Sequence, residues 1–432
     1  MMSLKQRAAR GAYSALLALL KPAYVARLWW RGRAEPLYRH ALAERLGDYA
    51  EAPSSGWFWV HAVSLGETRA AGALIEQMRA QRPDLRLLLT HGTATGREAG
   101  RALLRDGDRQ AWLPYDTPGV VRRFLAQFHP ALGVLMETEV WPNLLVAAHA
   151  QGVRMVLANA RLSEKSRRQG ERLDAVLRPA VESLDLVLAQ TEADAQRLRG
   201  AGAREVHVRG NLKFDMAPDP ALVARGSAWR AALDRPVLLF AVSREGEEAA
   251  LLAAWKRQAE TRRRPLLVIV PRHPQRFDEV AALVLGAGLQ LVRRSTWSDE
   301  LPPDAAVADA WLGDSMREMP LYYGLAQVAL LGGSFAPLGG QNLIEAAACG
   351  CPVVMGPHTF NFTQAAELAQ AAGAAQRVDD LEAGLAAALA LLDDPGALAD
   401  AAARSTAFAA AHRGAARAMA HDIAALWPTG SA

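Results

Sequence analysis

Two carboxylates in this sequence each follow directly on an apolar stretch of strand type. Glu67 closes the run WVHAVSLGE (59–67), and Glu137 follows ALGVLM (131–136). A carboxylate near a helix start stays ionised and can accept a proton from an alcohol, while a second one orients the site or tunes its charge. The structural alternatives are that Glu67 only complements a helix dipole and that Glu137 or Glu139 caps its helix. The pattern therefore indicates either general-base chemistry or ordinary helix starts.

Cationic groups occur at three further points. GNLKFD (210–215) contains Lys213, whose ammonium group could reach a phosphate or carboxylate of a ligand; the alternative is an isolated surface lysine. SREGEE (243–248) follows an apolar stretch and opens a helix, which offers N–H donors at a positive dipole end. VPRHPQRF (270–277) holds Arg272, His273 and Arg276. These segments favour the binding of an anion.

A glycine-rich composite in the second half favours a nucleotide. The segment LLGGSFAPLGGQNLIEAAACGCPVVMGP (330–357) has two glycine pairs, then Asn342 and Glu345 one helical turn apart. Glycines permit close approach of a ligand, a helix start favours a phosphate, and Glu345 can accept hydrogen bonds from ribose hydroxyls.

The elements that must position these residues form two series. Apolar runs alternate with helical patterns, which is typical of parallel sheets covered on both faces. The first series of expected strands is 57–63, 85–90, 131–136, 153–159, 185–190 and 205–209, and the second is 236–242, 265–270, 289–293, 327–332 and 352–355. A helix is expected from Thr68 to Arg79.

The chain length suits two domains, because 432 residues exceed the usual size of a single core. We predict two α/β halves with a cleft between them. The expected boundaries are an N-terminal segment 1–33, a first domain 34–215, a linker 216–235, a second domain 236–410 and a C-terminal helix 411–432.

Composition excludes several classes of protein. Residues 1–50 hold nine Lys and Arg against three Asp and Glu, so the net charge of +4 is an N-terminal feature and gives no reason to expect nucleic acid. The two cysteines, Cys349 and Cys351, are too close for a good disulfide, which fits a reducing compartment. The sequence lacks a P-loop, a GxGxxG fingerprint, HExxH and CxxC, so neither a metal site nor a dinucleotide cofactor is indicated.

The segment AYSALLALLKPAYVARLWW (12–30) is short for a spanning helix, which needs about 20 apolar residues. Basic residues beside Trp29 and Trp30 favour an interfacial helix on an anionic membrane surface. The alternative is a soluble helix packed on the first domain.

Taken together, the motifs resemble the 3-deoxy-D-manno-octulosonic acid (Kdo) transferases that act on the lipid A precursor. The resemblance rests on HAVSLGE, METEVWPNL, NARLSEKS, GNLKFD, VPRHPQRF and GGSFAPLGGQNLIEAAACGCPVVMGPHTFNF, in that order. It implies a GT-B fold, with two Rossmann-like domains facing a central cleft, the acceptor bound by the first domain and CMP-Kdo by the second. It also implies an enzyme at the cytoplasmic face of the inner membrane, with no cofactor and no metal.

The resemblance assigns roles to individual residues. The general base falls on Glu67, the carboxylate that stabilises the transition state on Glu137, and the stabilising lysine on Lys213. The residues that match those holding CMP are Pro271, Arg272, Met316, Arg317, Glu318, Asn342, Leu343, Ile344 and Glu345. Direct displacement would invert the anomeric configuration.

One position departs from the family pattern, since relatives usually carry Gly where this chain has Arg317. Two rival interpretations keep the architecture. One is another GT-B transferase or a sugar-nucleotide epimerase that uses UDP, and the other is a membrane-peripheral binding protein on a degenerate scaffold.

Overall fold

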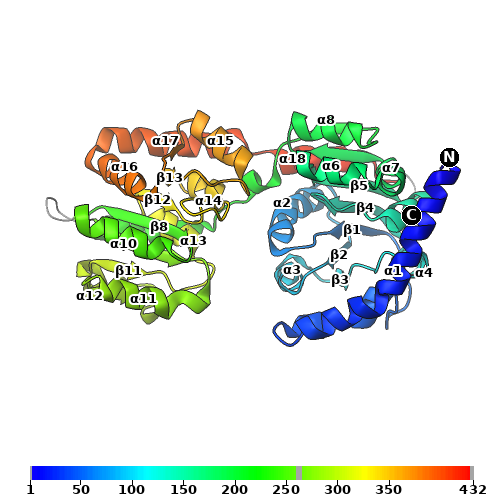
Figure 1. The fold of residues 1–432 in the computed structure, drawn as a ribbon, viewed down its shortest axis with the longest axis horizontal. Coiled ribbons are helices and arrows are strands. Elements are labelled where there is room, and N and C mark those ends of the chain that lie inside the picture. Colours follow the sequence, from blue (N-terminus) through cyan, green and yellow to red (C-terminus); the bar gives the residue numbers. More distant parts are fainter. Residues whose placement is uncertain (1, 259–264, 429–432) are drawn as a thin grey trace. The chain divides into compact units, whose positions relative to one another are not determined.

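The computed structural model describes residues 2–258 and 265–428 and divides them into two compact units (Figure 1). Unit 1 comprises the described residues up to Met216 together with those from Arg413 onward. Unit 2 comprises the described residues between Ala217 and His412. The chain therefore enters unit 2 once and returns to finish in unit 1.

Unit 1 is built on a parallel sheet, which in the described residues has seven strands in the order β3-β2-β1-β4-β5-β6-β7. Because β1 pairs with both β2 and β4, it lies in the middle of this sheet. The strands are β1 (Trp57–His61), β2 (Leu87–His91), β3 (Arg109–Trp112), β4 (Pro130–Met136), β5 (Arg154–Ala160), β6 (Leu186–Ala189) and β7 (Val206–Val208).

Helices cover both faces of this sheet, which is why its strands are apolar on both sides. Phe58 and Val60 face α2 (Leu65–Gln81) and α18 (Ala415–Ala425), whereas Trp57 and Trp59 face α4 (Pro118–Phe128) and the layer beside it. The remaining helices of unit 1 are α1 (Leu4–Arg31), α3 (Ala94–Gly100), α5 (Pro142–Ala150), α6 (Glu164–Glu171), α7 (Asp174–Val181) and α8 (Glu192–Gly200).

Unit 2 repeats the same plan. In its described part the sheet is parallel, with seven strands in the order β10-β11-β9-β8-β12-β13-β14. These are β8 (Val237–Ser243), β9 (Leu266–Pro271), β10 (Leu291–Arg293), β11 (Ala310–Leu312), β12 (Val328–Leu331), β13 (Val353–Met355) and β14 (Ala375–Arg377). The helices are α9 (Pro220–Ala232), α10 (Glu247–Gln258), α11 (Phe277–Gly286), α12 (Pro303–Val307), α13 (Met319–Leu325), α14 (Leu343–Ala348), α15 (Thr363–Ala371), α16 (Leu381–Asp393) and α17 (Pro395–Ala411).

The segment 216–235, expected as a linker, is mostly helical. Asp219 caps α9 by accepting the N–H of Ala221, and Pro220 occupies the first helical position. Helix α9 packs so tightly on α13 that a Cβ at Gly226 would lie 2.1 Å from the Leu321 carbonyl oxygen. Residues 217–235 are thus an integral part of unit 2.

The C-terminal region 411–432 contains α18, which completes unit 1. Ala416, Met419 and Ile423 join the apolar core beneath α2. The carboxylate of Asp215 accepts the N–H groups of Gly414 and Ala416, both at 2.6 Å, and so fixes the start of this helix.

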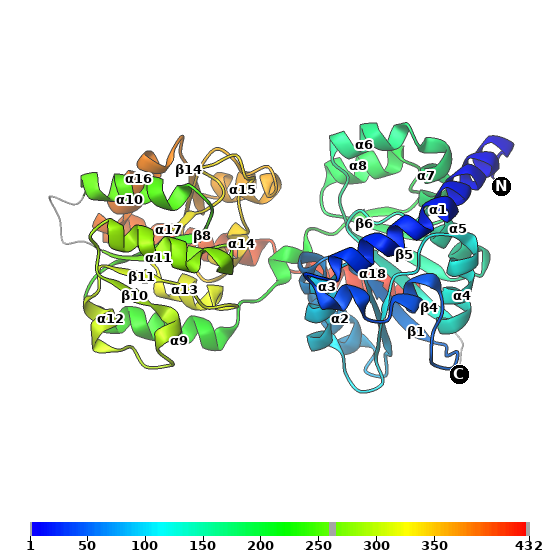
Figure 2. The ribbon, with the colours of Figure 1, turned by 60° about the horizontal axis from the view of Figure 1, so that its bottom comes forward.

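Helix α1 lies along unit 1 beside α5 and α7 (Figure 2). Tyr13 donates a hydrogen bond to Asp116 (3.0 Å), and Arg45 donates one to the Tyr24 hydroxyl (3.0 Å). Among the described helices, none combines the length and the hydropathy needed to cross a bilayer.

We predict that Gly226→Ala destabilises the protein, because the new methyl group would press on a backbone carbonyl that cannot rotate away. The free energy of unfolding should fall by about 2–3 kcal/mol, measured by urea denaturation. Gly286→Ala is the control, since a Cβ there meets nothing within 4 Å; equal losses in both variants would contradict the packing argument.

Candidate functional site

Glu67 lies at the start of α2, and its carboxylate is already engaged with the backbone. Its Oε2 accepts the N–H of Val63 (2.9 Å), and its Oε1 accepts the hydroxyl of Ser64 (2.9 Å). Ser64 is the N-cap of α2 and accepts the N–H of Glu67 in return. Glu67 thus lies in the first turn of α2, where the expected complement to the helix dipole is in place. These hydrogen bonds fix the carboxylate at the carboxyl edge of the sheet.

Glu137 follows β4, the strand that pairs with β1, so both carboxylates lie at the same edge. Its backbone has φ +59°, a left-handed conformation that costs a non-glycine residue energy. Two hydrogen bonds to the neighbouring strand hold it there, from the Glu137 N–H to Ala158 and from the Arg161 N–H to Glu137. The idea that Glu137 or Glu139 caps α5 is wrong, because Trp141 is the N-cap and makes no side-chain capping bond.

Lys213 reaches this edge from the chain that follows β7. Its Nζ lies 3.4 Å from Oε1 of Glu137, and both side chains are about three-quarters buried. The alternative of an isolated surface lysine is therefore wrong, and contact of Lys213 with a ligand stays a prediction.

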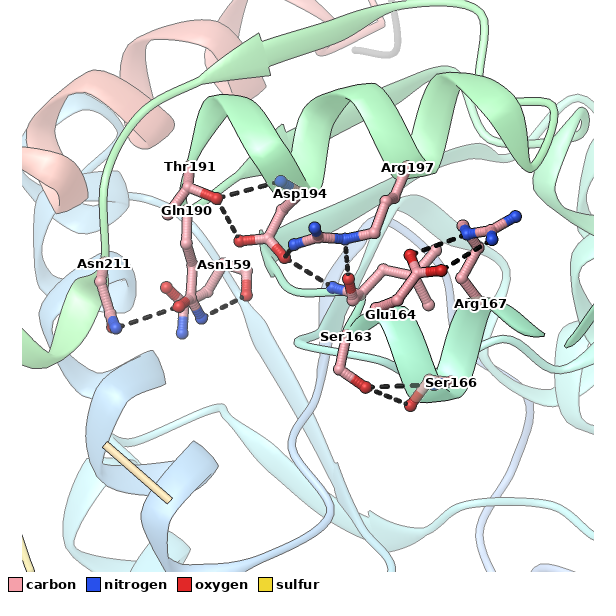
Figure 3. Close-up of polar contacts among 11 residues, drawn as sticks. Asn159, Ser163, Glu164, Ser166, Arg167, Gln190, Thr191, Asp194, Arg197 and Asn211 are labelled. Atoms are coloured by element: carbon pink, nitrogen blue, oxygen red, sulfur yellow. Dashed lines mark hydrogen bonds and ion pairs between the residues drawn. The ribbon is translucent and has the colours of Figure 1, made fainter. Parts of the chain in front are cut away.

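A chain of amide hydrogen bonds positions the turn that carries Lys213 (Figure 3). Asn211 Nδ2 donates to Gln190 Oε1, and Gln190 Nε2 donates to the Asn159 carbonyl, each at 3.0 Å. Asn159 Oδ1 accepts the N–H of Leu212, and Asn211 Oδ1 accepts that of Lys213. The segments NARLSEKS and GNLKFD therefore meet in space, and Asn159 and Gln190 are positioning residues that sequence reasoning did not single out.

Burial governs the electrostatics of this edge. Desolvation raises the pKa of Glu67, opposed by its two hydrogen bonds, and the negative charge of Glu137 adds to the rise. Burial also raises the pKa of Glu139 to about 7, with a further contribution from Glu67. Three carboxyl groups and one ammonium thus interact at the carboxyl ends of β1 and β4, and a group with a raised pKa is a better base.

In unit 2, some of the cationic side chains expected to bind an anion are already paired with carboxylates of the protein. Pro271 ends β9, and Arg272 is exposed, its N–H bonded to Ser243. Arg276 instead forms ion pairs with Glu248 (2.8 Å) and Glu279 (2.8 Å). Of the cationic cluster, Arg272 and His273 are exposed, whereas Arg276 is partly buried.

Glu247 is a residue that sequence reasoning missed. Its carboxylate accepts N–H groups from Arg244, Gly333, Phe335 and Ala336. The start of α10 and the first glycine pair, both expected to bind an anion, are therefore joined by a carboxylate of the chain itself. A glutamate four residues after the end of β8, at the first position of α10, was the available signal.

The segment Met316–Glu318 lies before α13. Met316 is exposed, and Arg317 has φ +67°, the left-handed region in which a glycine pays no steric cost. Glu318 Oε1 accepts Arg294 Nη2 at 2.9 Å, which fixes its side chain.

The segment Asn342–Glu345 starts α14. Asn342 is the N-cap and accepts the N–H of Ile344, while Glu345 lies in the first turn. Leu343 and Ile344 are buried in the core, so their side chains do not face a ligand. Contacts to a ligand are left to Asn342, Glu345 and the backbone. Within the described chain no cluster of His, Cys, Asp and Glu could hold a metal ion.

Two parallel α/β units with polar side chains at the carboxyl ends of their strands define a GT-B-like fold. A glycosyltransferase structure from Rickettsia africae superposes on 88% of this chain and 100% of its own with a TM-score of 0.57, at 11% identity. That likeness establishes the fold alone.

Sequence relatives establish the family. Residues 40–216 match the family model described as 3-deoxy-D-manno-octulosonic-acid transferase (kdotransferase). A 3-deoxy-D-manno-octulosonic acid transferase of Bordetella pertussis is 49% identical over 94% of this chain and 97% of its own length. One from Haemophilus influenzae is 35% identical over 82% of this chain and 83% of its own. The chain belongs to the Kdo transferase family, and the expected fold class and activity are confirmed.

We predict that Arg317→Gly stabilises the protein by up to about 1 kcal/mol, because it relieves the left-handed backbone at a smaller entropic cost. Arg317→Ala removes the same charge but keeps the strained backbone, so it should show no such gain. Thermal denaturation of the two variants separates these effects; equal behaviour would mean that the backbone is unstrained.

Proposed function

We propose that this protein transfers Kdo from CMP-Kdo to the lipid A precursor, lipid IVA, in the synthesis of the lipopolysaccharide core. Membership of the family supports the proposal that Kdo is the sugar transferred. The observation that carries the proposal is the partly buried Glu67 carboxylate beside the Glu137–Lys213 ion pair, at the carboxyl edge of the unit 1 sheet.

Glu67 acts as the general base. The acceptor hydroxyl oxygen attacks the anomeric carbon as its proton passes to Glu67, and the bond from that carbon to CMP breaks with the electron pair leaving on the phosphate. Attack opposite to the leaving group inverts the anomeric configuration. The hydrogen bonds from Val63 and Ser64 hold the carboxylate in place, and burial raises its pKa and hence its basicity.

Glu137 and Lys213 stabilise charge during the transfer. Positive charge develops at the anomeric carbon as CMP leaves, and the negative charge of Glu137 stabilises it. The Lys213 ammonium group neutralises the carboxylate of the sugar. Hydrogen bonds hold the main chain of both residues in place before the substrate binds. Charges that are fixed in advance stabilise a transition state most effectively.

Unit 2 binds the CMP moiety. Arg272 neutralises the phosphate, and Asn342 and Glu345 hold the ribose. The site is completed by Pro271, Met316, Arg317 and Glu318 and by the backbone of Leu343 and Ile344. No step requires a metal, because CMP is a monophosphate leaving group and cationic side chains neutralise it.

Helix α1 rests on the cytoplasmic face of the inner membrane. One face of α1 is bonded to unit 1, whereas Leu16, Leu19, Trp29 and Trp30 are between 54% and 77% exposed. Exposed apolar side chains beside basic ones suit an anionic bilayer surface. This arrangement combines both interpretations of the segment: the helix packs on the first domain and faces lipid.

We predict that Glu67→Gln lowers turnover by about 10²–10⁴-fold, because the amide keeps the shape of the side chain but takes up no proton. The assay is transfer from freshly generated CMP-Kdo to tetraacylated lipid A precursor without added metal, followed by mass spectrometry. Asp380→Asn is the control, since this exposed carboxylate also accepts a backbone N–H at a helix start, as the N-cap of α16 in unit 2. Near-normal turnover of a folded Glu67→Gln variant would rule out the base assignment.

We predict that Leu19→Glu combined with Trp30→Glu weakens binding to vesicles of phosphatidylglycerol and phosphatidylethanolamine by about 10-fold or more, because two apolar side chains no longer insert. Val307→Ser in unit 2, equally exposed at 71%, should leave co-sedimentation unchanged. Unchanged binding of the α1 variant would exclude this helix as the membrane contact.

A further inference from the structure

Glu139 lies in the loop after β4, two residues beyond Glu137, and its side chain turns toward β1. Its Oε2 lies 4.0 Å from Nε2 of His61, the last residue of that strand. The Glu139 side chain is 21% exposed and that of His61 is completely buried. The loop that carries Glu137 thus has a second carboxyl group, facing the sheet.

The hydrogen-bond partners of Nδ1 indicate which ring nitrogen of His61 carries the hydrogen. Nδ1 lies 3.1 Å from the Thr90 carbonyl oxygen, which can only accept, and 3.0 Å from the Thr90 hydroxyl oxygen, which already accepts Trp59 Nε1. We assign the ring hydrogen to Nδ1, which can donate it to either oxygen. Burial lowers the pKa of His61 to about 3, so the ring is neutral and Nε2 holds a lone pair. Among the described residues, Nε2 has no hydrogen-bond partner although it is buried.

An unprotonated Nε2 of His61 and an ionised Glu139 carboxylate cannot form a hydrogen bond, because each of them can only accept one. A protonated carboxyl group can instead donate to Nε2, and a side-chain adjustment of about 1 Å brings the two atoms to hydrogen-bond distance. The bond would satisfy a buried nitrogen that is otherwise costly to leave unpaired.

The charged groups around this pair also favour a neutral Glu139. Glu67 from α2 and Glu137 from its own loop raise the pKa of Glu139, whereas the side chain of Trp141 lowers it. His91 and Arg45 lower the pKa of His61. Burial and the charge of Glu67 raise the pKa of Glu139 to about 7. The ammonium of Lys213 is paired with Glu137.

We propose that Glu139 serves the transfer in its neutral form, as a positioning residue that donates a hydrogen bond to Nε2 of His61 and so fixes the loop that carries Glu137. When Glu139 ionises, this bond is lost and three carboxylates repel one another, which displaces Glu137 from Lys213. A neutral Glu139 also leaves less negative charge to oppose an acidic sugar. The role in transfer rests on the proposed function.

The first test is the pH profile of kcat/KM. For the wild type, activity should fall about tenfold per pH unit above pH 7, as Glu139 loses its proton. Glu139→Gln, a neutral amide that can donate to Nε2, should keep activity at pH 6 within about threefold and should not show this fall up to pH 8.5. Glu44→Gln is the matched control, because Glu44 is equally exposed at 21%; it should keep the wild-type profile.

Two results would overturn the inference. A Glu139→Gln variant that is folded but inactive at every pH would show that the ionised carboxylate is required. A variant with the wild-type fall above pH 7 would show that another group titrates. Circular dichroism and the melting temperature establish folding in each case.

The second test needs no substrate. Nitrogen-15 NMR of the histidine rings should show Nδ1 of His61 protonated, and an Nε2 resonance that shifts between pH 6 and 8.5 in the wild type but not in Glu139→Gln. A protonated Nε2 would contradict the hydrogen bond. If these spectra behave as expected while wild-type protein transfers no Kdo to the lipid, the proposed function fails and the Glu139–His61 pair stands.

Discussion

The parallel pairing of β1 with β4 is the constraint on which the site of unit 1 depends. Parallel strands end at the same edge of a sheet, so the turns that follow Trp57–His61 and Pro130–Met136 deliver Glu67 and Glu137 to one place. Lys213 lies in the turn that follows a more distant strand, β7, yet the side chain of Asn159 near the end of β5 accepts the N–H of Leu212 and holds that turn close to the centre of the sheet. The buried carboxylates need this cation, because unpaired buried charge is costly. Sheet topology and charge balance therefore support the same geometry.

The two units use carboxylates in the same structural way at their strand-to-helix turns. Glu67 accepts an N–H at the start of α2, and Glu247 accepts four at the start of α10 and the glycine-rich turn. Such bonds satisfy backbone donors that a helix start leaves unpaired. The difference lies in their neighbours: Glu67 is near a second carboxylate and a lysine, whereas Glu247 is surrounded by N–H donors. The surroundings, rather than the residue type, separate a proposed catalytic group from a structural one.

Much of this architecture could be predicted from the sequence, because a strand with a long apolar run is recognisable from its residue pattern. The eleven expected strands all overlap strands of the structure, but β3, β11 and β14 were missed. Each has three or four residues, and β3 and β14 carry arginine and glutamine in place of an apolar run. The motif residues were found by type and spacing, whereas Gln190, Asn159 and Glu247 act through hydrogen bonds to distant segments. Those partners are fixed only by the tertiary fold, so local pattern could not identify them.

Backbone strain at strand ends shows where the fold holds its functional turns. Glu137 after β4, Val242 within β8 and Arg317 before α13 all have positive φ without being glycine. A residue keeps such a strained backbone conformation only where several surrounding hydrogen bonds and contacts hold it there. For Glu137 those bonds run to β5 on both sides of the residue, and at Val242 the ladder to β9 shifts register between Ala241 and Ser243. At these two turns the sheet itself holds the strained residue, so the carboxylate of Glu137 is aimed by the same hydrogen bonds that assemble the core.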